Sequence, residues 1–400
     1  MASFQEMTFS ELLSDAEVFV DGDWVESKDQ DPNGDVRLIQ LADIGDGFYI
    51  DKSSRFLNSE TAKRLKCTYL KEGDILVARM PDPLGRACIF PKSEKPCVTV
   101  VDVCIIRPNP NKVDNRWLMH TINLPVMRQR INEYVTGTTR QRISRGNFSK
   151  LKISVPPLAE QRRIAAILDQ ADVLRQKRQQ AIEKLDRLLQ ATFIDMFGDP
   201  NTYQNRFPIK SLKQVCTKIT DGEHGTVERL ESGKLYLMAR NITKNMTLDI
   251  TEVSYISEED HQRIYKRCSP EFGDLMIVCV GATIGKLCLV PDMEEFSLAR
   301  SVALLKPDNN SVISQYLLHL LASDYMQQKI LNSRNTAAQA GLYLGKLSII
   351  EVPVPPKELQ EKWSKIALSI EDQKQKLYKQ LDIQNQLFIS LQNQAFNGTL

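Results

Sequence analysis

The sequence predicts an α+β protein in which two similar globular domains are joined by two long helices that pair as an antiparallel coiled coil. Three observations support this prediction. Landmarks of the first half recur in the second half at an offset of 199 or 200 residues, half of the 400-residue chain. Two stretches of about 40 residues lack Pro and Gly and carry an apolar stripe. Short β-branched runs separated by turn sequences precede each stretch.

The repeat extends over the whole chain. Its matched landmarks are Asp21-Gly22 with Asp221-Gly222, Glu72-Gly73-Asp74 with Phe272-Gly273-Asp274, Gly85-Arg86 with Gly285-Lys286, and Pro156-Pro157 with Pro355-Pro356. A chain built from two similar halves is expected to present two similar surfaces with pseudo-two-fold symmetry. The natural partner has two sites at a fixed spacing, and duplex DNA is the commonest such partner.

The repeat predicts four segments: a first globular domain (1–155), a first long helix (156–200), a second globular domain (201–354) and a second long helix (355–400). The first domain contains the strand-like runs Val36–Leu41, Asp74–Arg79 and Val98–Ile106, and a helical pattern over Arg116–Tyr134. The second contains Lys234–Arg240, Asp274–Val280 and Val302–Lys306, and a helical stretch over Ser314–Leu331. This mixture of elements is typical of α+β domains.

The long helices are expected over 158–197 and 357–396. Each follows a Pro-Pro pair, which a helix interior excludes, and each ends at a glycine suited to a C-cap. The predicted seam of the first is Ala171, Leu174, Arg178, Ala181, Leu185, Leu188 and Thr192; that of the second is Ile366, Ile370, Gln373, Leu377, Leu381, Gln384, Phe388, Leu391 and Ala395. One such stripe would be more typical of a core helix, whereas two matched stripes, each roughly 60 Å long, favour a coiled coil.

Composition excludes several classes of protein. The eight cysteines contain no Cys-x-x-Cys pair and the four histidines are scattered, so we expect reduced thiols, no metal, no cofactor and a cytoplasmic location. The N-terminal segment lacks the features of a signal peptide, and no apolar run approaches a membrane span. The net charge of +2 means that any basic footprint must be local.

The strongest local basic field lies in residues 126–152, where seven basic residues accompany one acid. Arg140, Arg142 and Arg145 cluster there in the loop sequence TGTTRQRISRGN. The counterpart in the second half, SRNTAAQAG around Arg334 and Asn335, is polar and has no acid. The two long helices are nearly balanced in charge, which suits protein contacts better than phosphate contacts.

These features resemble a known family. The first domain closes with KLKISVPPLAEQRRIAAILDQAD, a long helix follows and ends near FGDP, and a second domain leads to PVPPKELQEKW and a final AFNGTL. The whole chain is similar to the DNA-specificity subunit of type I restriction–modification systems. The most specific element is Pro-Pro-x-x-Glu-Gln at 156–161, from which the second copy departs.

The resemblance implies a function. Two target-recognition domains would each read one half of a split, asymmetric site in double-stranded DNA. The paired helices would act as a ruler and dock two adenine methyltransferase subunits, with the restriction (nuclease/translocase) subunits recruited through them. The chain itself would be non-catalytic, and the methyltransferase would flip out the target adenine.

Candidate DNA-binding residues follow from side-chain chemistry. Arg140, Arg142 and Arg145 are expected on the DNA-facing side, more often at phosphates than at bases. Arg79 and Arg240 end or follow strands and could bond a guanine edge, although each could instead be a solvated strand-end charge. Arg300 could reach DNA or pair with an acid. The remaining candidates are Arg86, Lys286, Arg334 and Asn335.

The segment Gly281-Ala-Thr-Ile-Gly-Lys286 resembles a phosphate loop only superficially. It has three residues between its glycines where a phosphate loop has four, and Leu287 follows the lysine. We expect a tight turn between two strands, with contact to the DNA backbone as the second interpretation and a nucleotide pocket as the least favoured.

The sequence gives little support for an enzyme. It contains no Asn-Pro-Pro-aromatic motif of an adenine methyltransferase, and no nucleophilic triad can be argued from isolated histidines. The alternative hypothesis is a coiled-coil scaffold whose end domains bind proteins.

Overall fold

The structure is a computed structural model that describes residues 4–137, 140–199, 206–334 and 341–400. The chain forms two compact units. The first comprises residues 1–179 and 379–400, and the second comprises 180–378. Each unit therefore combines one globular domain with part of both long helices.

The first domain contains three small sheets. The strands are β1 (Gln5–Thr8), β2 (Val18–Asp21), β3 (Val36–Ile39), β4 (Arg55–Leu57), β5 (Ile75–Ala78), β6 (Ala87–Ile89), β7 (Cys97–Thr99), β8 (Val103–Arg107) and β9 (Lys152–Val155). They pair in the orders β2-β8-β5-β6, β4-β3-β7 and β1-β9, and all pairs are antiparallel except β3 with β7. The helices are α1 (Phe9–Leu12), α2 (Ser59–Arg64), α3 (Asn115–Ile122), α4 (Pro125–Glu133) and α5 (Arg145–Ser149).

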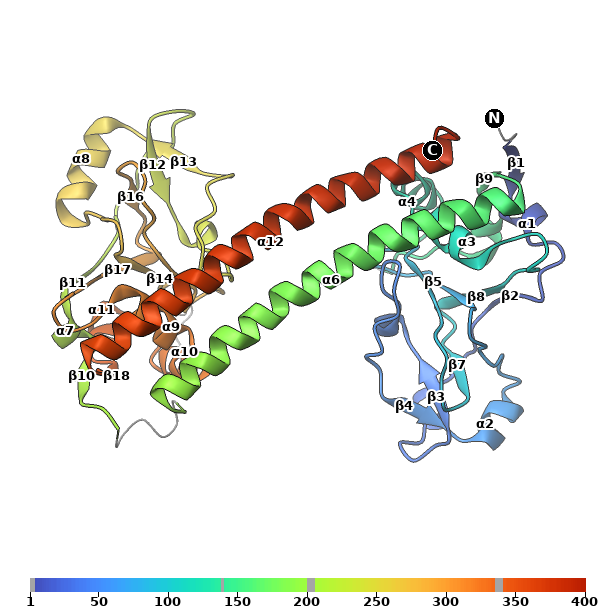
Figure 1. Cartoon of the computed structure of the whole chain (residues 1–400), viewed down its shortest axis with the longest axis horizontal. Coiled ribbons are helices and arrows are strands. Elements are labelled where there is room, and N and C mark those ends of the chain that lie inside the picture. Colours follow the sequence, from blue (N-terminus) through green and yellow to red (C-terminus); the bar gives the residue numbers. More distant parts are fainter. Residues whose placement is uncertain (1–3, 138–139, 200–205, 335–340) are drawn as a thin grey trace. The chain divides into compact units, whose positions relative to one another are not determined.

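The second domain repeats this topology strand for strand (Figure 1). Its strands are β10 (Ile209–Ser211), β11 (Cys216–Asp221), β12 (Lys234–Leu237), β13 (Ser254–Ile256), β14 (Leu275–Val278), β15 (Leu287–Leu289), β16 (Ser297–Leu298), β17 (Val302–Pro307) and β18 (Glu351–Pro353). They pair as β11-β17-β14-β15, β13-β12-β16 and β10-β18. Its helices are α7 (Leu212–Val215), α8 (Glu258–Arg267), α9 (Ser314–Ala322), α10 (Asp324–Asn332) and α11 (Leu344–Ser348).

Two expectations about local structure need correction. Each helical stretch that the sequence predicts as continuous is two helices, because Pro125 starts α4 at its first turn and Ser323 caps α10. The run Val98–Ile106 is likewise two strands, β7 and β8, separated by a turn.

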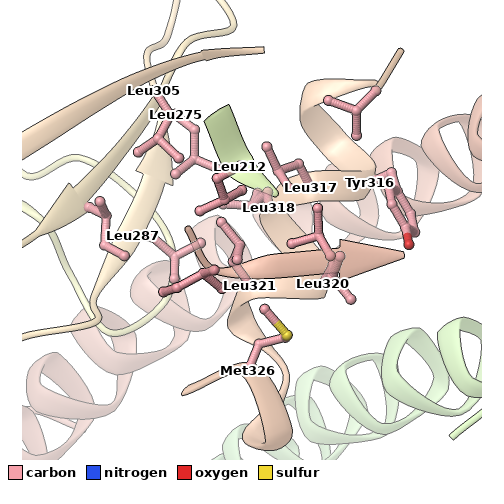
Figure 2. Close-up of a cluster of buried hydrophobic side chains, with 14 of the residues drawn as sticks. Leu212, Leu275, Leu287, Leu305, Tyr316, Leu317, Leu318, Leu320, Leu321 and Met326 are labelled. Atoms are coloured by element: carbon pink, nitrogen blue, oxygen red, sulfur yellow. The ribbon is translucent and has the colours of Figure 1, made fainter. Parts of the chain in front are cut away.

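The two long helices are α6 (Leu158–Phe197) and α12 (Lys357–Asn397), and both complete the domain cores. In the first unit, the start of α6 (Ile164, Ala165, Leu168) and the end of α12 (Ala395) are buried with the first domain. In the second unit, Phe193 and Phe197 of α6 and Trp363 of α12 join a buried cluster. Figure 2 shows leucines of α9 and of strands β14, β15 and β17 in that cluster. Neither domain core is therefore complete without both helices.

The helices run antiparallel within each unit. In the first unit, Arg163 of α6 bonds the carbonyl of Leu400 at 2.9 Å, and Arg175 bonds Asn385 at 2.8 Å. In the second unit, Asp186 of α6 lies 2.8 Å from the amine of Lys374.

The predicted seam is wrong at several positions. Leu174 and Leu188 are 55% and 51% exposed, whereas the neighbouring Ile182 and Leu189 are buried. The actual stripe passes through Arg175, whose guanidinium lies over the ring of Phe388 at 4.4 Å. On α12, Gln373 is exposed and Lys374 takes its place. A search for hydrophobic residues misses Arg175 and Lys374, because both are charged side chains whose long aliphatic stems can pack in the seam.

A buried glutamine joins each long helix to its domain. Gln161 is 1% exposed; its carbonyl oxygen accepts the backbone N–H of Asp114, and its amide nitrogen donates to the carbonyls of Lys112 and Pro156. Gln360 is 0% exposed and makes the matching hydrogen bonds. Its carbonyl oxygen accepts the N–H of Ile313, and its amide nitrogen donates to the carbonyls of Ser311 and Pro355. Buried polar groups require hydrogen-bond partners, and these bonds supply them. They explain why a glutamine follows the Pro-Pro pair in both halves.

Replacing Gln161 or Gln360 by Ala is expected to destabilise the chain by about 2–4 kcal/mol, because each change leaves buried N–H and C=O groups without partners. Urea unfolding followed by circular dichroism measures the effect. The matched control is Gln386→Ala, since that glutamine is exposed on α12 and, among the described residues, bonds Asp382 on its own helix. A cost below 1 kcal/mol at both sites, on the scale of typical surface changes, would contradict this role.

Candidate nucleic-acid interface

The first candidate surface lies where the turn after β2 meets the turn after β7 in the first domain. The turn after β2 approaches the turn after β7 so closely that a Cβ at Gly22 would lie 2.3 Å from the carbonyl oxygen of Val100. Only glycine fits this approach. Asp23 then bonds backbone to backbone with Thr99 at 2.8 Å, and its carboxylate accepts the N–H of Thr68 at 3.0 Å. Burial raises the pKa of Asp23, against the effect of that hydrogen bond.

A groove of about 790 Å³ lies at this junction. Its lining includes Trp24, Gln40, Met80, Asp102, Arg140 and Arg142. The guanidinium of Arg142 lies 3.4 Å from both Asp102 and the carbonyl of Val101. Arg140 is exposed and makes no ion pair within the described part of the chain. The structure thus brings two of the three predicted arginines to one groove.

The rest of the basic stretch is largely engaged within the domain. The sequence predicts Arg145 in a loop, but the structure shows that it begins α5. Its guanidinium donates to the carbonyl of Phe19 at 2.5 Å and lies 4.0 Å from Asp21. Arg128 pairs with Asp46, Arg130 bonds the carbonyl of Lys152, and Lys152 pairs with Glu6. The local excess of positive charge is therefore smaller than the sequence suggests.

Arg79 and Arg86 are buried, at 3% and 8% exposure. Arg79 pairs with Asp21 at 3.3 Å and donates to the carbonyl of Val101. Arg86 donates to the carbonyls of Ile44, Leu41 and Pro83, and so holds the short turn η2 (Leu41–Asp43). Burial lowers the pKa of both guanidinium groups. Their geometry favours a structural role, and their contact with DNA remains a prediction.

The second domain presents arginines at the corresponding turns. Arg240 lies in η4 (Ala239–Asn241), the counterpart of η2, where the first domain has Ala42. Arg300 lies in the turn after β16, where the first domain has Val101. Both are exposed, and Arg240 bonds the hydroxyl of Ser254 at 3.1 Å. The turns are joined, since Ser301 accepts the N–H of Ala239 at 3.2 Å. Among the described residues Arg300 has no acid partner, which disfavours its alternative role in an internal ion pair.

The remaining candidates of the second domain are separate. Lys286 is half-buried and follows a tight turn between β14 and β15, as predicted, in which Gly281 and Gly285 have φ of +96° and +95°. Arg334 is exposed just after α10. Asn335 lies outside the described residues.

Two exposed residues at the candidate interface were missed by sequence reasoning. Trp24 is 67% exposed beside the first groove, and His224 takes its place in the second domain, 2.7 Å from Asp221. The signal was present in the repeat, because Asp-Gly-Asp-Trp aligns with Asp-Gly-Glu-His at an offset of 200.

Within the described ranges, no group of three His, Cys, Asp or Glu side chains could hold a metal ion. All eight cysteines are free, and burial raises the pKa of Cys104 to about 12.

No helix in the part of the chain that the structure describes is long and apolar enough to cross a membrane.

The repeated topology defines a class of protein: two domains of one fold, each completed by the same pair of long helices. The profile of the type I restriction modification DNA specificity domain matches residues 10–184 and 207–385. The chain belongs to this family.

Similar proteins agree with this assignment. The EcoBI specificity subunit of Escherichia coli is 25% identical over 284 residues, which cover 64% of this chain and 59% of that protein. The type I S subunit of M. genitalium superposes with a TM-score of 0.60 at 18% identity, over 99% of this chain and 96% of that one. A chain from a structure on complex assembly and conformational transition of the type I system gives a TM-score of 0.53 at 16% identity, over 100% and 98%. The solved structures confirm the fold.

Proposed function

We propose that this chain binds double-stranded DNA at a bipartite, asymmetric sequence, with each domain reading one half-site. The observation that carries the proposal is that the DNA-specificity family matches both halves of the chain. Exposed arginines in both domains support it, Arg140 in the first and Arg240 and Arg300 in the second, since arginine bonds both phosphates and guanine edges.

The half-sites should differ because the corresponding side chains differ. At three equivalent positions the first domain has Trp24, Ala42 and Val101, and the second has His224, Arg240 and Arg300. An arginine can form a bidentate pair with guanine, which alanine or valine cannot. The two domains therefore offer different donors to DNA on the same scaffold.

We further propose that the helices dock two methyltransferase subunits, with restriction subunits bound through them, and that catalysis resides in these partners. Large apolar side chains that remain exposed on the helices support a protein contact. They are Val173, Leu174, Leu188 and Ile194 on α6, and Leu368, Ile383, Leu387 and Ile389 on α12. The proposed complex acts on DNA in the cytoplasm.

A salt titration tests DNA binding. The purified chain should bind a random-sequence duplex with an affinity that falls steeply with salt, because bound arginines release counterions. Replacing Arg140, Arg240 and Arg300 by Ala should reduce the slope of log K against log salt by about 2–3 units.

The matched control is Arg162→Ala, which removes an exposed arginine of α6. Its slope should equal that of the unmodified chain. An unchanged slope in the triple variant would show that these arginines do not face DNA. Failure of the unmodified chain to bind any duplex would instead favour the scaffold hypothesis.

A further inference from the structure

Trp24 differs from the other tryptophans of the chain. The sequence contains three, and Trp117 and Trp363 are both 0% exposed, whereas Trp24 is 67% exposed. A single exposed apolar side chain is common on protein surfaces and needs a further reason before a role is assigned. That reason comes from how the turn holds Trp24 and from what surrounds it.

The backbone just before Trp24 is held in place by close packing and hydrogen bonds. Gly22 packs directly against the carbonyl of Val100, and Asp23 is bonded through its N–H to Thr99 and through its carboxylate to Thr68. The indole N–H donates to Glu26 at 3.2 Å. The ring is therefore presented outward from a fixed turn, so little conformational entropy would be lost when it binds a ligand.

The charged side chains that line the neighbouring groove are three acids and two arginines, and each of the acids has a partner among the described residues. Glu26 pairs with Lys28 at 2.6 Å, Asp102 pairs with Arg142, and Asp23 is bonded to Thr68. Arg140 alone among the groove's charged side chains is exposed without an ion pair in the described structure. A ligand with a flat apolar face next to an anionic group fits this pairing of an indole with a free guanidinium. A nucleotide within DNA has both features.

We propose that Trp24 contacts a base of the first half-site while Arg140 binds an adjacent phosphate. This inference rests on the proposed DNA-binding function and assigns a specificity-determining residue within it. Aromatic and apolar side chains contact base faces by partial insertion between steps, and they contact the thymine methyl group in the major groove. The second domain has His224 here, so the contact belongs to one half-site only.

The experiment uses the intrinsic fluorescence of the full chain. The probe is a duplex that the unmodified chain selects from a random-sequence library. Because the other two tryptophans are buried, iodide should quench mainly Trp24. Saturating duplex should change the Trp24 emission and protect it from iodide, and Trp24→Phe should abolish the DNA-dependent change.

Binding by the variants gives a second readout. Trp24→Ala should weaken binding to the selected duplex about ten- to a hundredfold, the range seen when one aromatic–base contact is lost. Trp24→Phe keeps a ring and should lose about threefold or less. Trp24→His should select sequences that are altered in one half-site and unchanged in the other. The matched control is Phe272→Ala, since Phe272 is 77% exposed and lines a groove with residues of α12.

The outcomes separate the two hypotheses. If no duplex is selected, the proposed function fails. If a duplex binds while Trp24 emission, iodide quenching and Trp24→Ala affinity stay unchanged, the function stands and this inference is overturned. A Trp24 signal that responds only to a methyltransferase subunit, and not to DNA, also overturns it.

Discussion

Replacing Lys374 by Glu is expected to destabilise the chain by about 3–5 kcal/mol, because the change places an unpaired carboxylate at a buried position next to two other carboxylates. Lys374 is 5% exposed, and its amine lies 2.8 Å from Asp186 on α6 and 3.0 Å from Glu371 on its own helix. The substitution would bury a third carboxylate beside these two. Urea unfolding followed by circular dichroism measures the loss.

Two further variants separate charge from packing. Lys374→Met should cost only about 1 kcal/mol, because Asp186 and Glu371 are 52% and 33% exposed and can be hydrated. The exchange of Lys374→Glu with Asp186→Lys should recover much of the lost stability. If the exchanged variant is no more stable than Lys374→Glu alone, the two helices do not pair through this contact.

The ion pair also predicts a dependence on pH. Burial lowers the pKa of Lys374, but hydrogen bonds to Asp186 and Glu371 outweigh burial and raise it above the ordinary 10.5. A raised pKa means that the folded state binds the proton more tightly. The stabilisation is thus fully present below pH 10.5 and is lost as the pH rises through the pKa of the folded state.

Lengthening both helices is expected to change which DNA sites are bound. The boundary between the two compact units lies at Gln179 on α6 and Tyr378 on α12, so four residues inserted after each leave both units intact. Four residues add about 6 Å, roughly two base-pair steps. The doubly lengthened chain should prefer a longer spacer and keep both half-site sequences. The original spacing should lose about 10²-fold or more in affinity, since only one domain can then engage.

Insertion in one helix only is the control. It shifts the seam of one helix against the other and should destabilise the chain. Binding to duplexes with graded spacers, and methylation by the complex assembled with its partners, measure the preferred spacing. If the doubly lengthened chain binds and methylates the original spacing as before, the helices are not the ruler.

The sequence by itself determined the repeat, the fold class and the two long helices. Local signals suffice for these, because a Pro-Pro pair and a glycine bound each helix and the apolar stripe persists for 40 residues. The sequence also predicted strands β3, β5, β12, β14 and β17, since runs rich in β-branched and apolar residues that are bounded by turn signals favour strands. The matched landmarks further predicted equivalent turns in the two domains, which the strand topology confirms.

Only the tertiary structure decided which charged residues are free to act. Arg79 and Arg86 look in the sequence like Arg140, yet long-range contacts to Asp21 and to the η2 carbonyls bury the first two. Lys374 occupies a position in the helix seam, where it pairs with Asp186 across the two helices and with Glu371 on its own helix. The exposure of Trp24 likewise depends on how the β2 and β7 turns meet. Burial of a charge or a ring depends on partners distant in sequence, so no local pattern encodes it.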